Sequence, residues 1–381
     1  MPATVLMALM GLEIGGVETH AVVLARHLKE MGFNVAMVSS GGIYEDTIAR
    51  YGIRHYQAPL DNSKPASIYS SVAAIRSIIA AEDVALIHAH ARIPAFVSDL
   101  ARRLTGIRFV TTAHAMFAAG LHLRFMSRWG EKTIVISSDI KEHLINKFRV
   151  AEKNIILIPN GIDIEAFNPD LPVGDIENEL RRVPDDKLIV YVSRLDSTLA
   201  PLAENLIEAC ARLYVEFPDI RLVIVGEGKN FYDVASKAGE ANVRTGTELV
   251  RLLGARKDVN RIMVAGDLVV GVSRVALEAM ACARNVLLAG GEGYGGLINE
   301  GSLPLFKNDN FTGRQFKKKA TVQNLEDAVR RFLLLPPDDR GKRGLSLRKF
   351  IVEEYSSVKM AADTAKVYEA VLKKEKSKEK E

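Results

Sequence analysis

The sequence predicts an α/β protein in which two doubly wound, mostly parallel sheets follow one another along the chain. Short apolar runs alternate with segments whose apolar residues recur at helical spacing, which is the order that builds βαβ units. This alternation stops at a stretch rich in proline and charge and then begins again. A chain of 381 residues is also long for a single core, so we expect two domains.

Composition restricts the class of protein. Lys and Arg number 51 and Asp and Glu 47, and this small excess does not indicate a nucleic-acid partner. The two cysteines, Cys210 and Cys282, fall in apparently buried helices, which excludes a disulfide framework and favours a reducing compartment. Residues 1–12 indicate a first strand and not a signal peptide, and no apolar run reaches the length of a membrane span. We therefore expect a soluble, cytoplasmic protein.

The first half opens with a βαβ unit. Residues 3–9 are predicted as a strand, 17–31 as a helix and 33–39 as a second strand, with Gly15 and Gly16 at the helix start. The spacing of these glycines departs from the G-x-G-x-x-G dinucleotide fingerprint, and no acidic residue for a ribose follows the second strand. A nicotinamide cofactor is therefore not expected.

The alternation continues through the first half and resumes in the second. Further strands are predicted at 85–88, 109–112, 133–136, 155–158, 187–192, 221–225 and 250–253. Further helices are predicted at 45–51, 67–80, 94–104, 139–148, 201–215, 231–238, 322–335 and 358–372.

Three histidines of the first half lie at or just beyond strand ends. The ligands of doubly wound sheets bind off the carboxyl ends of the strands, where His88, His90 and His114 would lie. The H-x-H pair could indicate a metal, but no third ligand has zinc-like spacing and no D-x-D is present, so no metal is expected. His114 could donate to a bound hydroxyl or phosphate, and a purely structural role for it stays equally open.

Residues 116–128 are apolar, with Arg124 and Arg128 interspersed. Such a surface could contact an amphiphilic acceptor or a membrane face, although a run of this kind more often packs inside the protein.

The stretch 168–186, with three prolines and many charges, is predicted to link the two domains. This places an N-terminal domain at 1–167 and a C-terminal domain at 187–355. We expect the helix at 356–372 to return to the N-terminal domain, and the charged segment 373–381 to be a disordered tail.

The stretch 267–296 combines a strand, a helix, a second strand and a glycine loop. Ser273 stands where the helix N-cap should be, so the positive end of the helix would face a phosphate or diphosphate. Glu278 lies inside this helix among apolar or small neighbours. Its two oxygens could accept hydrogen bonds from a pair of ribose hydroxyls, or it could be an ordinary half-exposed helix glutamate, and both interpretations stay open.

Several motifs in this order resemble those of a known family. They are GGVETH at 15–20, His114 after VTT, IPNGID at 158–163, VSRLD at 192–196 with Arg194, VGEG at 225–228 and ALEAMA at 276–281. Together they resemble the retaining glycosyltransferases of family four. That family has the GT-B architecture of two Rossmann-like domains facing a cleft, and the resemblance extends from about residue 5 to about residue 372.

The resemblance implies a nucleotide-sugar donor held mainly by the second domain. Arg194 would pair with the donor diphosphate, Glu278 would hold the ribose hydroxyls, and the helix beginning near Ser273 would face the phosphates. Asn160, in the IPNGID motif, is grouped with the donor-binding residues. Because arginine, N–H groups and a helix dipole meet the phosphate charge, neither a cofactor nor a divalent metal is expected.

The resemblance also implies that a glycan or lipid-linked acceptor binds the first domain. Gly15 and Gly16 would let the backbone approach the leaving group and acceptor closely, and His114 would contact the transferred sugar. A lipid-linked acceptor would place the protein at the inner membrane face.

Two positions depart from the family pattern. Leu199 stands five residues beyond Arg194, where a lysine is usual, and Val270 stands eight residues before Glu278, where a second glutamate is usual. Arg274 at the helix start is hypothesised to replace the lysine, with Lys229 as the other candidate. The departures also leave open a non-catalytic relative that binds a nucleotide or glycan as a partner or regulatory subunit.

Overall fold

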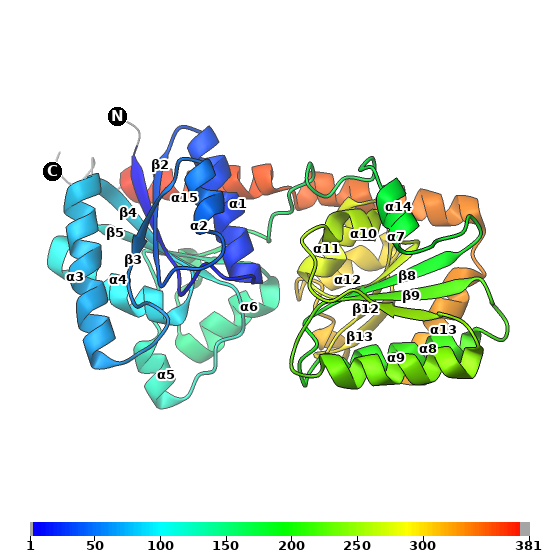
Figure 1. The fold of residues 1–381 in the computed structure, drawn as a ribbon. Helices are drawn as coiled ribbons and strands as arrows, with labels where there is room; N and C mark the ends of the chain where they lie inside the picture. The colour runs from blue at the N-terminus through cyan, green and yellow to red at the C-terminus, as the bar shows by residue number, and fades with distance from the viewer. Residues whose placement is uncertain (1–2, 374–381) are drawn as a thin grey trace. The chain divides into compact units, whose positions relative to one another are not determined.

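The computed structural model describes residues 3–373, which form two compact units (Figure 1). The first unit combines residues 3–161 with 357–373, and the second comprises residues 162–356. Each unit is built on a doubly wound, mostly parallel sheet, so the predicted fold class is confirmed. Most of the predicted tail, residues 374–381, lies outside the described residues.

The first unit holds a seven-stranded parallel sheet in the order β3-β2-β1-β4-β5-β6-β7. Its strands are β1 (Thr4–Ala8), β2 (Asn34–Ser39), β3 (Arg54–Gln57), β4 (Val84–Ala89), β5 (Arg108–Ala113), β6 (Lys132–Val135) and β7 (Ile155–Leu157). Its α-helices are α1 (Gly16–Glu30), α2 (Glu45–Arg50), α3 (Pro65–Glu82), α4 (Arg92–Thr105), α5 (Leu121–Met126), α6 (Ser138–His143) and α15 (Ser357–Lys373).

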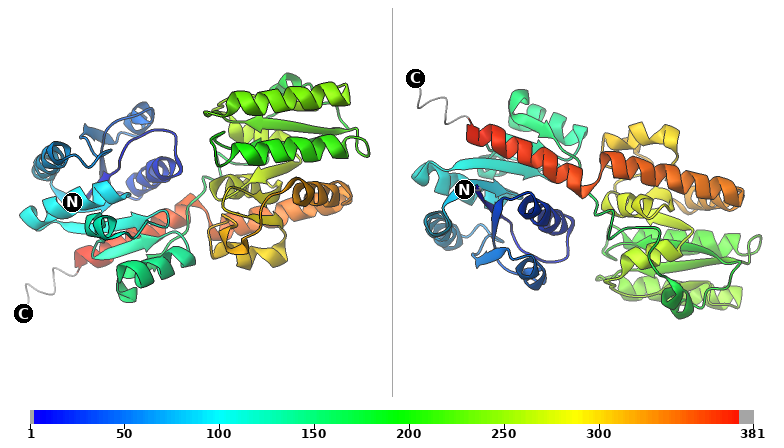
Figure 2. Two further views of the ribbon diagram at one scale, coloured as in Figure 1. Left: turned by 90° about the horizontal axis from the view of Figure 1, so that it is seen from below. Right: turned by 90° about the horizontal axis from the view of Figure 1, so that it is seen from above.

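Both faces of this first sheet are buried. Along β1 the side chains of Val5 and Met7 pack against α1 and α15, whereas Leu6 and Ala8 pack against α3 and α4. Helix α15, red in Figure 2, lies along α1 although more than three hundred residues separate the two in sequence. Burial on both faces explains why the central strands β1, β2 and β4 are mostly apolar runs and not alternating ones.

The second unit holds a six-stranded sheet in the order β10-β9-β8-β11-β12-β13, in which β13 is antiparallel to β12. Its strands are β8 (Lys187–Val192), β9 (Ile220–Val225), β10 (Val250–Leu252), β11 (Leu268–Gly271), β12 (Asn285–Ala289) and β13 (Tyr294–Leu297). Its α-helices are α7 (Gly174–Glu179), α8 (Ala200–Leu213), α9 (Phe231–Thr245), α10 (Val259–Ala265), α11 (Arg274–Ala281), α12 (Leu303–Lys307), α13 (Val322–Leu333) and α14 (Pro337–Glu354).

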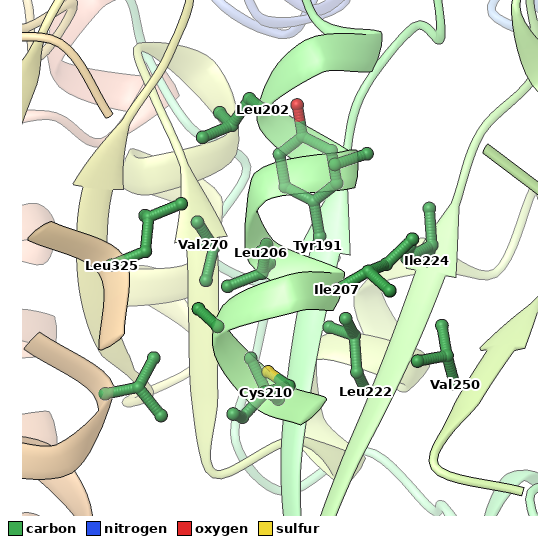
Figure 3. Close-up of a cluster of buried hydrophobic side chains, with 14 of the residues drawn as sticks. Tyr191, Leu202, Leu206, Ile207, Cys210, Leu222, Ile224, Val250, Val270 and Leu325 are labelled. Atoms are coloured by element: carbon green, nitrogen blue, oxygen red, sulfur yellow. The ribbon is translucent and has the colours of Figure 1, made fainter. Parts of the chain in front are cut away.

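Helices α8, α9 and α13 cover one face of the second sheet, and α10, α11 and α14 cover the other (Figure 1). Figure 3 shows the core beneath α8, where Leu206 and Cys210 pack over side chains of the sheet. Val270 of β11 is among these core residues and is fully buried.

The boundary between the units lies at residues 161 and 162, and not at the predicted stretch 168–186. That stretch belongs to the second unit, because it forms α7 and buries Ile176 in the second core. The chain leaves the first unit at Gly161, where a Cβ atom would lie 2.6 Å from the Cα of Ser357. Proline and charge therefore marked a surface segment of the second unit, not a free linker.

Candidate functional site

Each sheet has one point at which the strand order reverses. In the first unit this point lies between β1 and β4, and in the second between β8 and β11. Ligands of doubly wound sheets bind beyond the carboxyl ends of the strands at this switch point. Most of the predicted site residues lie there, because α1 follows β1, His90 follows β4, Arg194 follows β8 and α11 follows β11.

Glycines let the loops of the second unit converge at its switch point. A Cβ atom at Gly290 would lie 2.7 Å from Val272 Cγ1, and one at Gly291 would lie 2.5 Å from Thr198 Cγ2. Gly226 (φ +138°) approaches the carbonyl oxygen of Ser193 so closely that a Cβ would clash with it. The glycine loop after β12 therefore packs against the loops that carry Arg194 and Ser273.

Arg194 projects from the loop after β8. Asp196 fixes this loop, because its Oδ1 accepts the backbone N–H groups of Thr198 (2.9 Å) and Leu199 (3.2 Å). The Arg194 side chain is 84% exposed, and its Nη2 lies 4.0 Å from Asp196 Oδ2. An exposed guanidinium on an ordered loop is suited to pairing with a phosphate.

The start of α11 is strained. Ser273 has φ +51° and ψ −124°, and Asn310 and Phe311 also have positive φ. The Ser273 N–H donates to the Phe311 carbonyl (2.6 Å), and Asn310 Nδ2 donates to Ser273 Oγ (3.4 Å). Ser273 is the N-cap residue of α11, as predicted, but its side chain makes no capping hydrogen bond. Such strain is typical of functional sites.

Arg274 and Glu278 form a buried ion pair one helical turn apart. Arg274 Nε lies 2.6 Å from Glu278 Oε1, and Glu278 is 8% exposed, so it is not the half-exposed glutamate of one interpretation. Burial raises the pKa of Glu278, and Arg274 partly opposes this shift. Arg274 Nη1 is buried and has no hydrogen-bond partner among the described residues. Arg274 therefore already contacts one carboxylate oxygen, and the expected contact of Glu278 with ribose hydroxyls stays a prediction.

The two departures from the family pattern place apolar side chains at their positions. Val270 is fully buried in the core beneath α8, so it cannot contact a ligand at the strand ends. Leu199 precedes the first turn of α8, and its carbonyl oxygen accepts the Tyr191 hydroxyl (3.2 Å). Lys229 is exposed in the loop after β9, whereas Arg274 is partly buried at the switch point itself.

Gly15 and Gly16 lie at the start of α1 in the first unit. A Cβ at Gly15 would clash with the Glu18 carboxylate, whereas one at Gly16 would meet no atom within 4 Å. The Gly15 carbonyl oxygen accepts both the N–H (3.0 Å) and the hydroxyl (2.8 Å) of Thr19. Close approach of a ligand to this backbone stays a prediction.

Histidines meet at the switch point of the first unit. His90 Nδ1 lies 3.2 Å from His114 Nε2, and the His20 ring of α1 lies 4.7 Å from the His114 ring. Sequence reasoning did not assign His20 to this group. Its position one turn into the helix after β1, beside β4, is the signal that could have done so.

His88, at the end of β4, packs against His90 and is itself held by two hydrogen bonds. Its Nδ1 lies 2.6 Å from the Tyr368 hydroxyl of α15, its Nε2 lies 2.7 Å from Thr112 Oγ1, and its ring lies 4.1 Å from that of His90. Burial lowers the pKa of His88 to about 3 and holds those of His90 and His114 well below the usual value. These three imidazoles are therefore neutral at physiological pH.

His20, His90 and His114 bring one ring nitrogen each to within 4.8 Å of one another, a spacing that could hold a metal ion. A metal-bound imidazole almost always donates its other N–H to an acceptor. His90 faces His114 with Nδ1, so a metal bound there would leave the proton on Nε2. That nitrogen is buried and has no hydrogen-bond partner among the described residues. The group therefore fits hydrogen-bonded neutral imidazoles better than a metal site.

Asn160 lies apart from the switch point of the first unit, to which it belongs. It follows β7, which is separated from β4 by β5 and β6 in the first sheet. At about 4.8 Å per strand, this separation is roughly 14 Å. Its Oδ1 is buried and has no hydrogen-bond partner among the described residues. The structure gives no contact that joins Asn160 to the other predicted residues.

The apolar run at 116–128 forms α5 and its flanks, and part of it is exposed, whereas packing inside the protein was the favoured expectation. Leu121 is 89% exposed and Phe125 is 65% exposed. The Arg128 guanidinium lies 5.1 Å from the centre of the Phe125 ring. Within residues 3–373, no helix combines the length and the apolar character that crossing a bilayer requires.

Comparison with known proteins agrees with this arrangement. The Glycosyltransferase Family 4 model matches residues 14–166, and the Glycosyl transferases group 1 model matches residues 174–344. The phosphatidylinositol N-acetylglucosaminyltransferase GPI3 subunit of Saccharomyces cerevisiae is 24% identical over 300 residues, which cover 71% of this chain and 64% of that protein. The chain thus spans less than two thirds of this relative's length.

Solved structures share the fold across both units. A glycosyltransferase from Rickettsia africae superposes with a TM-score of 0.81 at 20% identity, covering 98% of this chain and 99% of that one. Anabaena Alr3699/HepE in complex with UDP superposes with a TM-score of 0.75 at 17% identity, covering 96% and 100%. The two family models together match most of the chain, and we conclude that it belongs to the family 4, group 1 glycosyltransferases of the GT-B fold.

Proposed function

We propose that the protein transfers a sugar from a nucleotide-sugar donor to a glycan or lipid-linked acceptor, with retention of configuration and without a divalent metal. The observation that carries the proposal is the buried Arg274–Glu278 pair at the strained start of α11. This helix follows β11, which lies next to β8, the strand that leads to Arg194. Family membership supports the reaction class.

Charge on the departing diphosphate would be met by protein groups. Arg194 offers an exposed guanidinium, and Arg274 offers Nη1, which has no hydrogen-bond partner among the described residues. The first-turn N–H groups of α11 and its dipole add further positive potential. Glu278 Oε2, on the carboxylate already held by Arg274, would accept from the ribose. Stabilising the leaving group in this way needs no metal.

A lipid-linked acceptor is supported by the surface of α5, where exposed apolar side chains lie beside Arg124 and Arg128. Exposed apolar side chains next to arginine favour contact with an anionic membrane surface. The name of the yeast relative also refers to a phosphatidylinositol acceptor. We infer that the protein works in the cytoplasm, at the inner membrane face.

The test is a thermal-shift panel of nucleoside diphosphates and sugar nucleotides in EDTA, followed by transfer assays with the donor that binds. A true donor at a hundred times its Kd should stabilise the protein by about 2.7 kcal/mol. Arg194→Ala should remove the shift without lowering the melting temperature of the free protein, because the side chain is exposed. The anomeric configuration of the product, read by NMR, tests retention. A flat panel would contradict the proposal.

A second candidate is a non-catalytic relative that binds a nucleotide or glycan as a partner subunit. The observation that favours it is the pair of apolar side chains, Leu199 and Val270, where the family usually has Lys and Glu. Stoichiometric binding of a sugar nucleotide with neither transfer nor donor hydrolysis would select this candidate.

A further inference from the structure

The neutral imidazoles of His90 and His114 share one hydrogen bond. His90 Nδ1 and His114 Nε2 lie 3.2 Å apart, and burial keeps the pKa of both side chains well below the usual value. A neutral imidazole carries one proton, so one of these facing nitrogens donates and the other accepts. Two arrangements are consistent with the heavy atoms.

Burial distinguishes the two arrangements. If His114 donated from Nε2, the His90 proton would have to sit on Nε2, which is buried and has no partner among the described residues. If His90 donates from Nδ1, its Nε2 is instead a bare lone pair. Buried N–H groups without a partner are rarer in proteins than under-used acceptors. The second arrangement is therefore favoured, and it leaves the His114 proton on Nδ1.

His88 and α15 hold His90 in place. Tyr368 is fully buried, and its hydroxyl has no acceptor other than His88 Nδ1 among the described residues, so Tyr368 donates to His88. His88 then donates from Nε2 to Thr112 Oγ1 at 2.7 Å. The centre of the fixed His88 ring lies 4.1 Å from the centre of the His90 ring, and His90 is 1% exposed. The His90 ring therefore cannot turn without displacing this network.

We propose that His90 is a positioning residue, which donates Nδ1–H to His114 and thereby holds His114 as an Nδ1–H donor toward the transferred sugar. The last part rests on the proposed function, whereas the tautomer itself does not. A neutral donor suits a sugar hydroxyl, which bears no charge to pair with an imidazolium.

The tautomer can be observed directly. In the full-length protein labelled with ¹⁵N-histidine, long-range proton–nitrogen spectra at pH 7.5 distinguish Nδ1–H from Nε2–H rings. His90 and His114 should both show the Nδ1–H pattern, and His88 the Nε2–H pattern. His122, which is exposed, should show averaged tautomers and serves as the internal reference. An Nε2–H pattern at His114 would overturn the proposal.

Two variants of matched size test the consequence. The amide nitrogen of Asn can replace Nδ1–H, whereas that of Gln reaches the place of Nε2. His90→Asn should keep kcat within about threefold, and His90→Gln should lower it about tenfold, the effect of one misplaced hydrogen bond, with a smaller change in donor KM. Equal losses in both variants would show a merely structural role and refute the proposal. Melting curves followed by Trp129 fluorescence confirm that both variants fold.

Two further results separate this inference from the proposed function. Absence of transfer with any donor, together with the expected tautomers, would contradict the function and leave the tautomer assignment intact. Stoichiometric binding of cobalt(II) with tetrahedral absorption bands would refute the inference, because the metal would compete for the His114 Nε2 lone pair that accepts this hydrogen bond.

Discussion

The switch points of the two units occupy the same place in the same kind of sheet but differ in charge, because the first holds neutral side chains and the second charged ones. The first gathers His20, His90 and His114, of which His90 and His114 are kept neutral by burial. The second holds the guanidinium of Arg274 and the carboxylate of Glu278 in direct contact, and the guanidinium of Arg194 lies on the loop after the neighbouring strand β8. All eight histidines of the chain lie in the first unit, and the second contains none.

Under the proposed function, this difference in charge would let each switch point suit a different ligand. Neutral imidazoles can form hydrogen bonds with sugar hydroxyls but do not attract a diphosphate. Two guanidinium groups close to one another attract it through their positive charge. Placing the charge in one unit and neutral donors in the other would keep the two ligands from competing for one site. Four tests would break or sharpen this contrast: acid and three variants of the second switch point.

Acid should destabilise the first unit selectively. Because the folded-state pKa values of His88, His90 and His114 are depressed, the unfolded chain binds more protons below the ordinary pKa of about 6.5. Stability is therefore lost as pH falls through 6.5, by about 1.4 kcal/mol per pH unit for each imidazole that stays neutral. Between pH 6.5 and 5.5 the three together amount to about 3 kcal/mol, because the unfolded imidazoles are only half protonated at pH 6.5.

Trp129, the single tryptophan, lies in the first unit and reports its unfolding by fluorescence. Hydrogen exchange of peptides from the second unit gives the comparison. Burial raises the pKa of Glu278, so its contribution to the stability of that unit changes in the opposite direction, increasing as pH falls. Parallel acid destabilisation of both units would show that the histidines do not distinguish them.

Arg274→Ala should remove the charge complementarity of the second switch point. Loss of one donor to a developing negative charge lowers kcat by about 10²–10³. The variant should also destabilise the second unit by about 1–3 kcal/mol, because Glu278 loses its buried partner. Arg244→Ala, which removes a half-exposed arginine paired with Glu208, is the matched control for both measurements.

The double variant Arg274→Ala, Glu278→Gln separates the two effects. It should regain stability, since no buried carboxylate is left unpaired, but not activity. If Arg274→Ala kept full donor affinity and turnover, Arg274 would have no role in binding the donor diphosphate.

Much of this contrast could be predicted from the sequence. The apolar runs predicted most strands of the two sheets by their residue ranges, and the resemblance assigned Arg194 and Glu278 to one donor. Edge strand β3 was missed because its four residues, RHYQ, have no apolar run, and α7 was missed because proline and charge resemble a linker. The Arg274–Glu278 contact could have been anticipated from i, i+4 spacing, but its burial could not.

The histidine group was harder to predict. Its members come from three separate loops and helices, and only the strand order brings them together. The support from Tyr368 depends on α15 returning to the first unit, a contact between residues 280 positions apart.

Leu199→Lys should have the smallest effect. If Arg274 fills the place of the usual lysine, the added cation should change kcat/KM less than about threefold. Leu199→Met controls for the change in shape at the N-terminus of α8. A gain of tenfold or more with Lys alone would mean that the second switch point lacks a cation, which Arg274 does not supply.

The return of α15 to the first unit sets the order in which the chain can acquire its structure during synthesis. Met360, Tyr368 and Val371 of α15 belong to the core that begins with Val5 and Met7. Residues 162–356 emerge from the ribosome before α15 does, which at typical translation rates takes roughly 10–40 s. The unit that starts the chain is therefore the last to be completed, and while the other unit folds one face of its sheet is covered by α1 but not yet by α15.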